Sequence, residues 1–432
     1  MHQALIIPEV LLEVFTHVNK SSFTRITSAR KSLAALAITC KMFHEPAMDL
    51  LWAEINHLEP LLGCVTRLHP LIYRSGSTRC KPWMIGVEPL SAHEVHQFLR
   101  HSARIRTLKI QSDHHFHLLS GIPAEACVFP RLRSLTLSTK YLDLFLPHTL
   151  HQCHLLTANE NLQSIAIRCT ALEHLRIYAS DVYADTRMAD ELSLLADRIR
   201  LCTRLVTLSC LMLDWEAWKH ISYLPTLLRM EINHGGVSPS PLGRDIVNLP
   251  PFVNITTLSF RELCDIGYII TVMQHSQFPS LKEFDLDVQV IYPEKAEQLF
   301  RALSRCTACQ TLERISVRAF NDEFQEDTSF SVIPHLLCFT QLRTLDLTLC
   351  NFCIYLDSDI LLQAMSTWPH IRTLHINSSC LDPFSVSLHG LFTMLGLCPQ
   401  LHTLQVPINV TTIDIDPDAE PIQHTALRSL EL

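Results

Sequence analysis

The sequence predicts an α/β solenoid, a horseshoe whose parallel β-sheet faces inward and whose helices lie outside, preceded by a small all-α domain of three helices. Three observations support this prediction. A nine-residue phrase returns about a dozen times between residues 100 and 432. A segment of helical character precedes most copies of the phrase. Residues 5–55 instead place apolar residues at three- and four-residue spacing, which is typical of short amphipathic helices.

The repeated phrase consists of a large apolar residue or Cys, then often Pro or Thr, then x-Leu-x-x-Leu-x-Leu. Clear copies span residues 129–137, 339–347 and 398–406. The closing Leu-x-Leu alternates with period two, as a half-buried strand does. The first leucine-type position is held in turn by Ile105, Leu132, Leu172, Leu205, Leu227, Ile255, Leu281, Leu312, Leu342, Ile371, Leu401 and Leu427. Most steps between these positions are 22 to 33 residues, and the step from 132 to 172 is 40.

Helices are predicted ahead of the strands at residues 190–201, 294–303, 360–365 and 384–397. In the second of these, Ala296, Leu299, Phe300 and Leu303 fall on one stripe. Helix, short connection, strand and loop together resemble one turn of a leucine-rich repeat protein. The resemblance covers residues 91–432, about 12 units, and implies a parallel sheet that lines a concave face.

The position three residues before the first leucine predicts a buried column. It is held by Phe129, Cys169, Cys202, Leu224, Phe252, Phe278, Cys309, Phe339, Trp368 and Cys398. Free Cys packs as a small apolar residue, so its presence beside Phe and Trp indicates burial. We therefore interpret Cys306/Cys309 and Cys350/Cys353, two Cys-x-x-Cys pairs spaced too far apart for a zinc ribbon, as structural thiols. No metal and no cofactor are predicted.

The first fifty-five residues predict three short helices. Pro8 suits a first helical position and Glu9 the first turn, where the helix dipole favours an acidic side chain. An apolar stripe follows at Val10, Leu11, Val14, Phe15 and Val18. Residues 33–43 and 45–52 supply the other two helices. So small a bundle cannot bury all of this apolar surface, and we expect part of it to meet a partner or the first repeats.

This block resembles the F-box, in particular that of F-box proteins from mushroom-forming (basidiomycete) fungi. Ile7-Pro8-Glu9 stands for the Leu-Pro-x-Glu opening, one residue shorter, and residues 10–15 for the helix that follows. Leu33, Leu36 and residues 38–43 match the middle of the motif, and Leu51-Trp52 its close; residues 22–31 lengthen the first link between helices. The resemblance implies that a Skp-type adaptor of a cullin–RING ligase docks on Ile7, Pro8, Leu11, Leu12, Phe15, Leu33, Leu36 and Cys40. The alternative is that the three helices only cap the open end of the solenoid.

The predicted division is therefore an F-box-like domain at 1–55, a partly helical connector at 56–90 with four prolines, and repeats at 91–432. The chain stops at Leu430-Glu-Leu432, inside a predicted strand, from which we expect a product truncated at the C-terminus.

Composition narrows the classes of function. A net charge of −8 argues against nucleic-acid and acidic-membrane surfaces, which need clustered Lys and Arg. There is no run of about twenty apolar residues and no secretory signal, so no membrane partner and a cytoplasmic or nuclear location are predicted. The 16 cysteines are then expected to be reduced.

No catalytic motif is present, and the chain is predicted not to be an enzyme. The histidines of residues 114–117 are interpreted as part of a polar loop between repeats, in preference to a metal site. The acidic stretches 322–327 and 414–420 are interpreted as solvated loops. A metal or thiol enzyme that uses Cys306/Cys309 or these histidines is the less favoured alternative.

The residues that flank the buried leucines predict a partner surface on the concave face. They are Arg176, Tyr178, Arg229, Glu231, Arg261, Asp285, Arg314, Arg318, Arg343, Asp346, Arg372 and His375. Their mixed charges favour a protein ligand over a polyanion. The sequence thus predicts a substrate-recognition subunit of a cullin–RING (SCF-type) ubiquitin ligase, which binds a Skp-type adaptor and a protein target. The alternative is a leucine-rich-repeat scaffold or inhibitor without a link to ubiquitin ligases.

Overall fold

The computed structural model describes residues 7–20, 26–74, 86–110, 115–123, 127–137, 142–155, 162–178, 199, 202–213, 215–233, 249–263, 266–320, 329–350, 353–378, 386–409, 414 and 424–431. The chain divides into two compact units, Met1–Ser180 (unit 1) and Asp181–Leu432 (unit 2). None of the helices described combines the length and the apolar character needed to cross a membrane.

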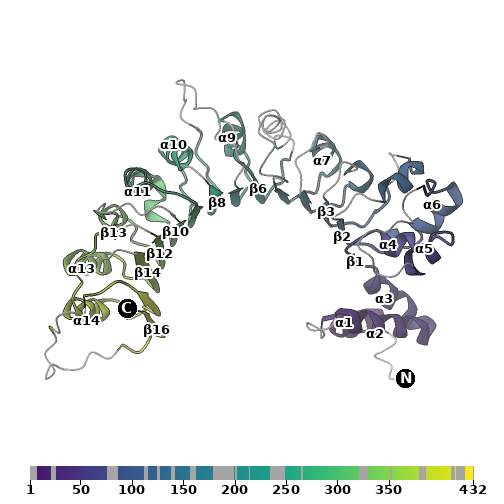
Figure 1. Cartoon of the computed structure of the whole chain (residues 1–432), viewed down its shortest axis with the longest axis horizontal. Coiled ribbons are helices and arrows are strands. Elements are labelled where there is room, and N and C mark those ends of the chain that lie inside the picture. The colour runs from purple at the N-terminus through teal and green to yellow at the C-terminus, as the bar shows by residue number, and fades with distance from the viewer. Residues whose placement is uncertain are drawn as a thin grey trace. The chain divides into compact units, whose positions relative to one another are not determined.

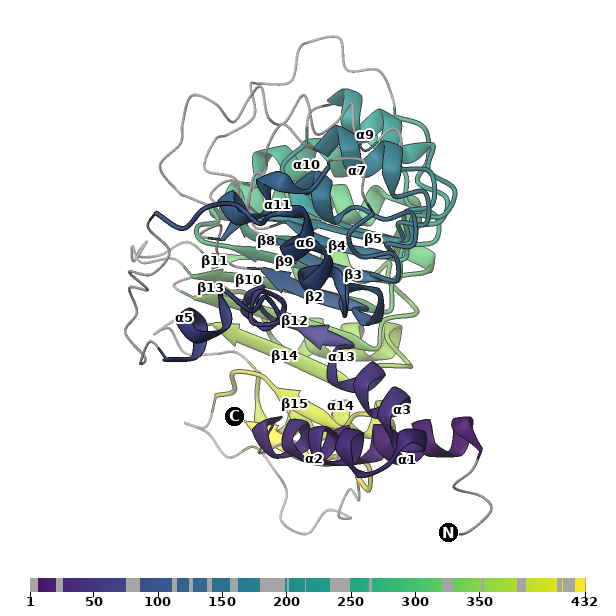
Figure 2. The same cartoon turned by 90° about the vertical axis from the view of Figure 1, so that its right-hand side faces the viewer.

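Unit 1 opens with three helices, α1 (Pro8–Lys20), α2 (Ile26–Thr39) and α3 (Lys41–Leu51), which pack together at its N-terminal end (Figures 1 and 2). The three predicted helices are confirmed, but α2 begins within the stretch predicted as a link, at Ile26. Cys40 separates α2 from α3 because its backbone is extended, with φ −155° and ψ 160°.

The rest of unit 1 alternates short helices with parallel strands. The elements are β1 (Glu54–Ile55), α4 (Glu59–Leu62), α5 (His69–Arg74), α6 (Ala92–Leu99), η3 (Ser102–Arg104), β2 (Thr107–Ile110), η4 (Phe116–Gly121), β3 (Ser134–Leu137), η5 (Leu142–Phe145), β4 (Gln152–Leu155), α7 (Leu162–Arg168) and β5 (His174–Ile177). Strands β1 to β5 pair in chain order, all parallel. Each strand therefore adds to the sheet at the position next to the one before it.

Strand β4 explains the 40-residue step in the repeat. Leu150 is buried, and two residues later β4 begins, as β3 begins two residues after Leu132. The missing phrase carries Cys153 where most other units carry leucine, and Cys153 is buried in the same way. The sequence pattern therefore missed one unit because a thiol took the place of a leucine.

The residues predicted as a connector contribute to the core of unit 1. Leu58, Leu61, Leu62, Val65 and Leu68 are all buried. The sheet begins still earlier, at β1, which pairs with β2 from inside the predicted helical domain. The division into 1–55, 56–90 and 91–432 stays a prediction. Residues 75–85 of the predicted connector lie outside the described residues.

Unit 2 repeats a strand and, in most units, a helix. Its elements are β6 (Thr207–Leu211), α9 (Trp215–Ser222), β7 (Arg229–Asn233), β8 (Thr257–Leu263), α10 (Gly267–His275), β9 (Glu283–Val288), α11 (Pro293–Arg305), η6 (Thr307–Gln310), β10 (Arg314–Phe320), α12 (Ile333–Leu336), β12 (Thr344–Cys350), α13 (Ser358–Thr367), β14 (Thr373–Ser378), α14 (Leu388–Leu397), β15 (Thr403–Gln405) and β16 (Ser429–Glu431). These strands pair in chain order, all parallel. Two short strands, β11 (Ser329–Phe330) and β13 (Cys353–Ile354), pair separately.

The helices of unit 2 lie along one side of its sheet (Figure 1). The leucines of the repeated phrase are buried on that side; Leu345, Leu347 and Leu349 of β12 are fully enclosed. The alternate residues face the other side, as the period of a strand requires, and most stay partly exposed; Ser209, Ser259 and Ser316 are buried there. The predicted α/β class is confirmed, and the parallel, repeat-like sheet is consistent with a solenoid.

Two of the predicted helices, 294–303 and 360–365, lie within α11 and α13. The fourth, predicted at 384–397, corresponds to α14, which starts at Leu388. The first, predicted at 190–201, lies outside the described residues apart from Ile199. Side chains cap two of these helices: Asp357 accepts a hydrogen bond from the amide of Ile360, and Ser387 accepts one from the amide of Gly390.

The predicted buried column is confirmed at nine of its ten positions. Aromatic members stack on one another; the rings of Phe252 and Phe278 lie 4.9 Å apart. Cys309 is the exception, because it lies half-buried in η6 while Cys306 and Ala308 are buried beside it. The 3-10 turn shifts the inward position away from Cys309.

Candidate functional site

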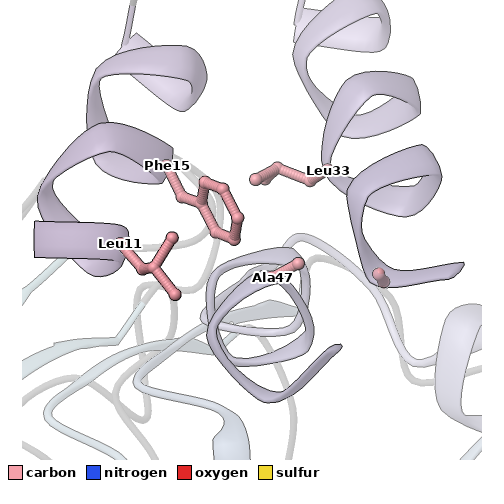
Figure 3. Close-up of a cluster of buried hydrophobic side chains, with 5 residues drawn as sticks. Leu11, Phe15, Leu33 and Ala47 are labelled. Atoms are coloured by element: carbon pink, nitrogen blue, oxygen red, sulfur yellow. The ribbon is translucent and has the colours of Figure 1, made fainter. Parts of the chain in front are cut away.

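Helices α1, α2 and α3 share a small apolar core. Leu11 and Phe15 of α1 point toward Leu33 of α2 and Ala47 of α3 (Figure 3). The ring of Phe15 meets that of Phe43 edge-on at 5.5 Å, a favoured aromatic geometry. These contacts hold the three helices together as one cluster.

The residues predicted to bind the adaptor differ in burial. Leu11, Phe15 and Leu33 are buried in the three-helix core, where their side chains hold the helices together. Leu36 and Cys40 are half-buried. Ile7 and Leu12 are exposed, and the side chain of Pro8 lies outside the description.

Three more apolar side chains of this cluster are exposed. With the two already named they form the exposed apolar set: Ile7 (48%), Leu12 (38%), Val14 (42%), Ile38 (87%) and Met42 (41%). The set lies on α1 and around the junction of α2 and α3. The sequence analysis grouped Val14 with Leu11 and Phe15 on one apolar stripe. It used spacing alone, which does not give the direction from which α3 packs.

A polar joint fixes α3 to the start of the sheet in unit 1. Arg104 of η3 donates hydrogen bonds to Asp49 and, at 2.5 Å, to Glu45, both on α3. The hydrogen bond from Arg104, which is the largest cause, and the positive charge of Arg104 lower the pKa of Glu45. Trp52 stacks on His101 with ring centroids 4.5 Å apart. The helical cluster and the first strands are therefore held in one arrangement.

The predicted partner residues of unit 2 lie on or beside the exposed face of the sheet. The registered middle positions of the strands form what we name the central row of unit 2: Ser209, Glu231, Ser259, Asp285, Ser316, Asp346, His375 and Gln405. Arg261 and Arg318 lie two residues further along their strands, and Arg229 and Arg314 two residues before. Arg343 and Arg372 directly precede their strands.

Asp346 is the centre of a network on this face. Its carboxylate accepts hydrogen bonds from Arg318 at 3.1 Å, Thr348 at 3.0 Å and Ser316 at 3.4 Å. Nδ1 of His375 lies 3.0 Å from the same carboxylate. The Asp346 side chain is only 14% exposed, so these neighbours and not water satisfy most of its acceptor positions. The network brings together three residues that the sequence predicted separately.

The same arrangement occurs two strands earlier. Asp285 binds Arg261 at 2.8 Å and accepts a hydrogen bond from Ser259 at 3.4 Å. In both cases the arginine and the serine come from the strand before, in a Ser-x-Arg pattern. A bulge between Phe260 and Leu263, with Glu262 at φ 55°, adds a residue next to Arg261. Beside the strands, Glu313 also pairs with Lys282 (3.6 Å) and Arg343 (3.3 Å).

Unit 1 has a corresponding central row of Lys109, Thr136, His154 and Arg176. The two residues predicted here come together, because Arg176 donates a hydrogen bond to the Tyr178 hydroxyl at 3.0 Å and lies 5.8 Å from its ring centroid. Burial lowers the pKa of His154, and the positive charges of Arg176, His174 and Lys109 lower it further. Sequence reasoning missed His154 because it missed β4; reading Cys153 as a leucine equivalent would have found both.

The histidines of 114–117 were predicted in a polar loop; this is wrong for His115, whereas His117 is exposed. His115 is buried, with Nε2 3.3 Å from Glu59, and Phe116 is buried in η4. The aromatic ring supplies the apolar surface that draws the segment inward. His114 lies outside the described residues.

Two of the buried thiols are poorly suited to bind metals or attack substrates. Burial raises the pKa of Cys202 and Cys398 to about 11, so both stay protonated near neutral pH. No three His, Cys, Asp or Glu side chains of the described ranges gather as metal ligands would. For Cys350 and Cys353 the structure describes the backbone alone and not the side chain.

Comparisons with known proteins give little guidance. No family model matches the chain, and no curated protein matches it. Among solved structures, a protein of Bacteroides fragilis from a structural genomics programme aligns with 60% of this chain and 69% of its own, at 14% identity and a TM-score of 0.29. The function must therefore be argued from the residues of the chain itself.

Proposed function

We propose that this chain is a substrate-recognition subunit of a cullin–RING (SCF-type) ubiquitin ligase. In this proposal the α1–α3 cluster is an F-box that binds the Skp-type adaptor, and the sheet is a leucine-rich repeat surface that binds a target protein. The chain itself makes and breaks no bonds. It raises the local concentration of the target near the ubiquitin-carrying enzyme.

The exposed apolar set is the observation that carries this proposal. Five large apolar side chains stay in contact with water although the cluster has a core of its own. Keeping them exposed costs solvation free energy, and an apolar surface of this kind is typical of a protein interface. The resemblance of residues 7–52 to the F-box motif names the partner.

The polar joint supports the second half of the proposal. A receptor that presents a target to an enzyme on another subunit benefits from a fixed geometry between its two binding surfaces. Arg104, with Glu45 and Asp49, and the stacked Trp52 and His101 provide such a fixed connection between α3 and the sheet of unit 1.

Co-purification with a Skp-type adaptor tests the proposal. We expect the wild-type chain to capture the adaptor, and Leu12→Asp to weaken capture by at least tenfold, because it puts a charge into an apolar contact. Ile167→Asp is the matched control, since Ile167 is also exposed and in unit 1 but lies on α7. If the wild-type chain captures no adaptor, the link to a ubiquitin ligase is wrong.

The alternative is a scaffold in which α1–α3 only cap the sheet. The pairing of β1 with β2 favours this alternative, because it ties the end of α3 directly to the sheet edge. The two proposals differ in the role of Leu12. If α1–α3 only cap the sheet, Leu12→Asp leaves capture of the adaptor unchanged.

A further inference from the structure

The C-terminal ends of α10 and α11 enclose a cavity on the helix side of unit 2. The two helices are neighbours (Figure 1), and the cavity between their ends has a volume of about 410 Å³. Cavities of about 300 to 1,000 Å³ are the usual size for small-molecule ligands. None of the described residues that line it belongs to a strand, so the cavity is separate from the sheet face.

Polar side chains from both helices line this cavity. Gln298, Arg301 and Arg305 follow one another at spacings of three and four residues in α11, which brings them to one face of the helix. Gln274 of α10 and Gln277, just after it, lie opposite in the lining. None of the described lining residues is Asp or Glu. The cavity therefore has two positive charges in its lining and no negative one.

Both arginines of the lining have donors to spare. Arg305 is exposed, and its side chain makes no ion pair or hydrogen bond with a described residue. Arg301 binds Glu297, one turn earlier on α11, and among the described residues it does so through Nη2 only. A guanidinium carries five N–H donors in a fixed fork, so Arg301 keeps most of its donors for another acceptor.

Ser276 adds a buried hydroxyl to the same lining. The residue is 3% exposed, and its Oγ has no hydrogen-bond partner among the described residues. The carbonyls on either side of it are already occupied, because His275 and Gln277 accept hydrogen bonds from the amides of Leu249 and Phe252. A buried hydroxyl without a partner is unfavourable. The lining therefore has more donors than acceptors, and an acceptor-rich ligand would complete it.

We infer that this cavity binds a small organic molecule that carries a phosphate monoester. Its phosphate lies at Arg301 and Arg305, and the Ser276 hydroxyl turns to a second staggered position to donate to it. Phosphate oxygens are strong acceptors, and arginine binds them in a bidentate manner. The buried Met273 and Ala302 form the apolar part of the lining, against which the organic part of the ligand lies.

A phosphate fits this lining better than a carboxylate does. A carboxylate has two oxygens, whereas a phosphate monoester has three terminal oxygens and more negative charge near neutral pH. Two guanidinium groups and a hydroxyl are better matched by the larger number of acceptors. The inference goes beyond the proposed function, because it adds a small-molecule ligand on a side of unit 2 that the target surface does not use.

Ligand-observed NMR on the full chain with phenyl phosphate tests the inference. Phenyl phosphate joins a phosphate monoester to a small apolar ring, and saturation-transfer difference spectra give its Kd. Benzoate keeps the ring and carries a carboxylate, and phenol keeps the ring without a strong anion. We expect saturable binding of phenyl phosphate, and binding of benzoate and phenol that is weaker by about tenfold or more.

Variants locate the binding. Arg305→Glu should weaken the binding of phenyl phosphate about tenfold or more, because it replaces a cation by a repelling carboxylate. Arg305→Gln, with about a threefold loss, replaces it if circular dichroism shows misfolding. Arg372→Glu is the matched control, since Arg372 is also an exposed arginine of unit 2 but lies outside the cavity, and its affinity should stay within about twofold of wild type.

Ser276→Ala separates a ligand contact from a structural role. In the free protein the hydroxyl has no partner to lose, so the variant should be no less stable to urea than wild type, and should bind phenyl phosphate about threefold more weakly.

Several results would overturn the inference. They are no binding by the wild-type chain, equal losses in Arg305→Glu and Arg372→Glu, and binding of benzoate or phenol as tight as that of phenyl phosphate. Tighter binding of a phosphoserine decapeptide than of phenyl phosphate would also overturn it, because the ligand would then be a phosphorylated protein.

Discussion

The sheet faces of unit 1 and unit 2 have the same parallel register but different charge arrangements. In the central row of unit 2, Asp285 and Asp346 each bind an arginine from the strand before. In the central row of unit 1, the corresponding positions hold Lys109, Thr136, His154 and Arg176. The central row of unit 2 therefore holds carboxylates that bind arginines of the same face, whereas the central row of unit 1 holds basic side chains and one threonine.

The difference shows that one position of the repeat decides what an arginine on this surface does. Where the next strand carries a carboxylate in the central row, the guanidinium is bound and becomes part of the structure. In unit 1 the strand after Lys109 carries Thr136 at this position, and Lys109 pairs instead with Glu54 of the strand before. The backbone is the same in both cases, so binding properties of such a sheet can change without a change of fold.

The largest effect on stability is expected in unit 2, for Asp346→Ala. The change removes the acceptor of Arg318, Thr348, Ser316 and His375, and leaves the fully buried Ser316 hydroxyl without that acceptor. We expect a loss of about 2 kcal/mol in the free energy of unfolding. Urea denaturation measures it, and hydrogen exchange of peptides from β10–β14 should show the loss as local.

Asp287→Ala is the control for Asp346→Ala. Asp287 lies on the same face in β9 but makes no ion pair within the described residues, so its removal should change stability by less than about 0.5 kcal/mol. Equal losses in the two variants would mean that the network contributes no more than an ordinary surface carboxylate does.

A smaller effect on the free energy of unfolding, which depends on pH, is expected for Glu94 of α6 in unit 1. Glu94 accepts hydrogen bonds from Arg67 and Ser91, which lower its pKa to about 2. Its ordinary pKa is 4.5, so its contribution to stability is complete above about pH 4.5 and is lost as the pH falls toward 2. We expect Glu94→Gln to cost about 1 kcal/mol at pH 7, reduced by the partial exposure of Arg67.

The pH series itself is the check on Glu94. The difference in unfolding free energy between wild type and Glu94→Gln should shrink steadily as the pH falls below 4.5. A difference that stays constant from pH 7 to pH 3 would show that the loss comes from the shape of the side chain and not from its charge.

The sequence predicted the fold class and most of the strands, because buried leucines recur with little variation. It missed β4, where Cys153 replaces leucine, and β1, which is only two residues long. For the candidate sites, periodicity identified the residues of the sheet face but not their partners. The pairs of Asp285 with Arg261 and of Asp346 with Arg318 join residues 24 and 28 positions apart in the sequence, and depend on the register between strands, which no local pattern reveals.

The direction of packing was a second limit. Leu11, Phe15 and Leu33 fit the resemblance to an adaptor-binding motif, yet they face the core of α1–α3. Apolar residues on a short helix can serve the core or a partner, and spacing alone does not separate the two roles. Ile38, the most exposed of the large apolar residues, lies next to the buried Ala37.

The smallest effect is expected for the exposed ion pair of unit 1, Lys109→Ala. Lys109 and Glu54 are about half exposed and 3.0 Å apart, so water and salt screen their attraction. We expect a change of no more than about 0.5 kcal/mol in unfolding free energy, against about 2 kcal/mol for Asp346→Ala. A loss of stability as large as that of Asp346→Ala would reverse the comparison, and would make Lys109 a structural residue of the kind found in unit 2.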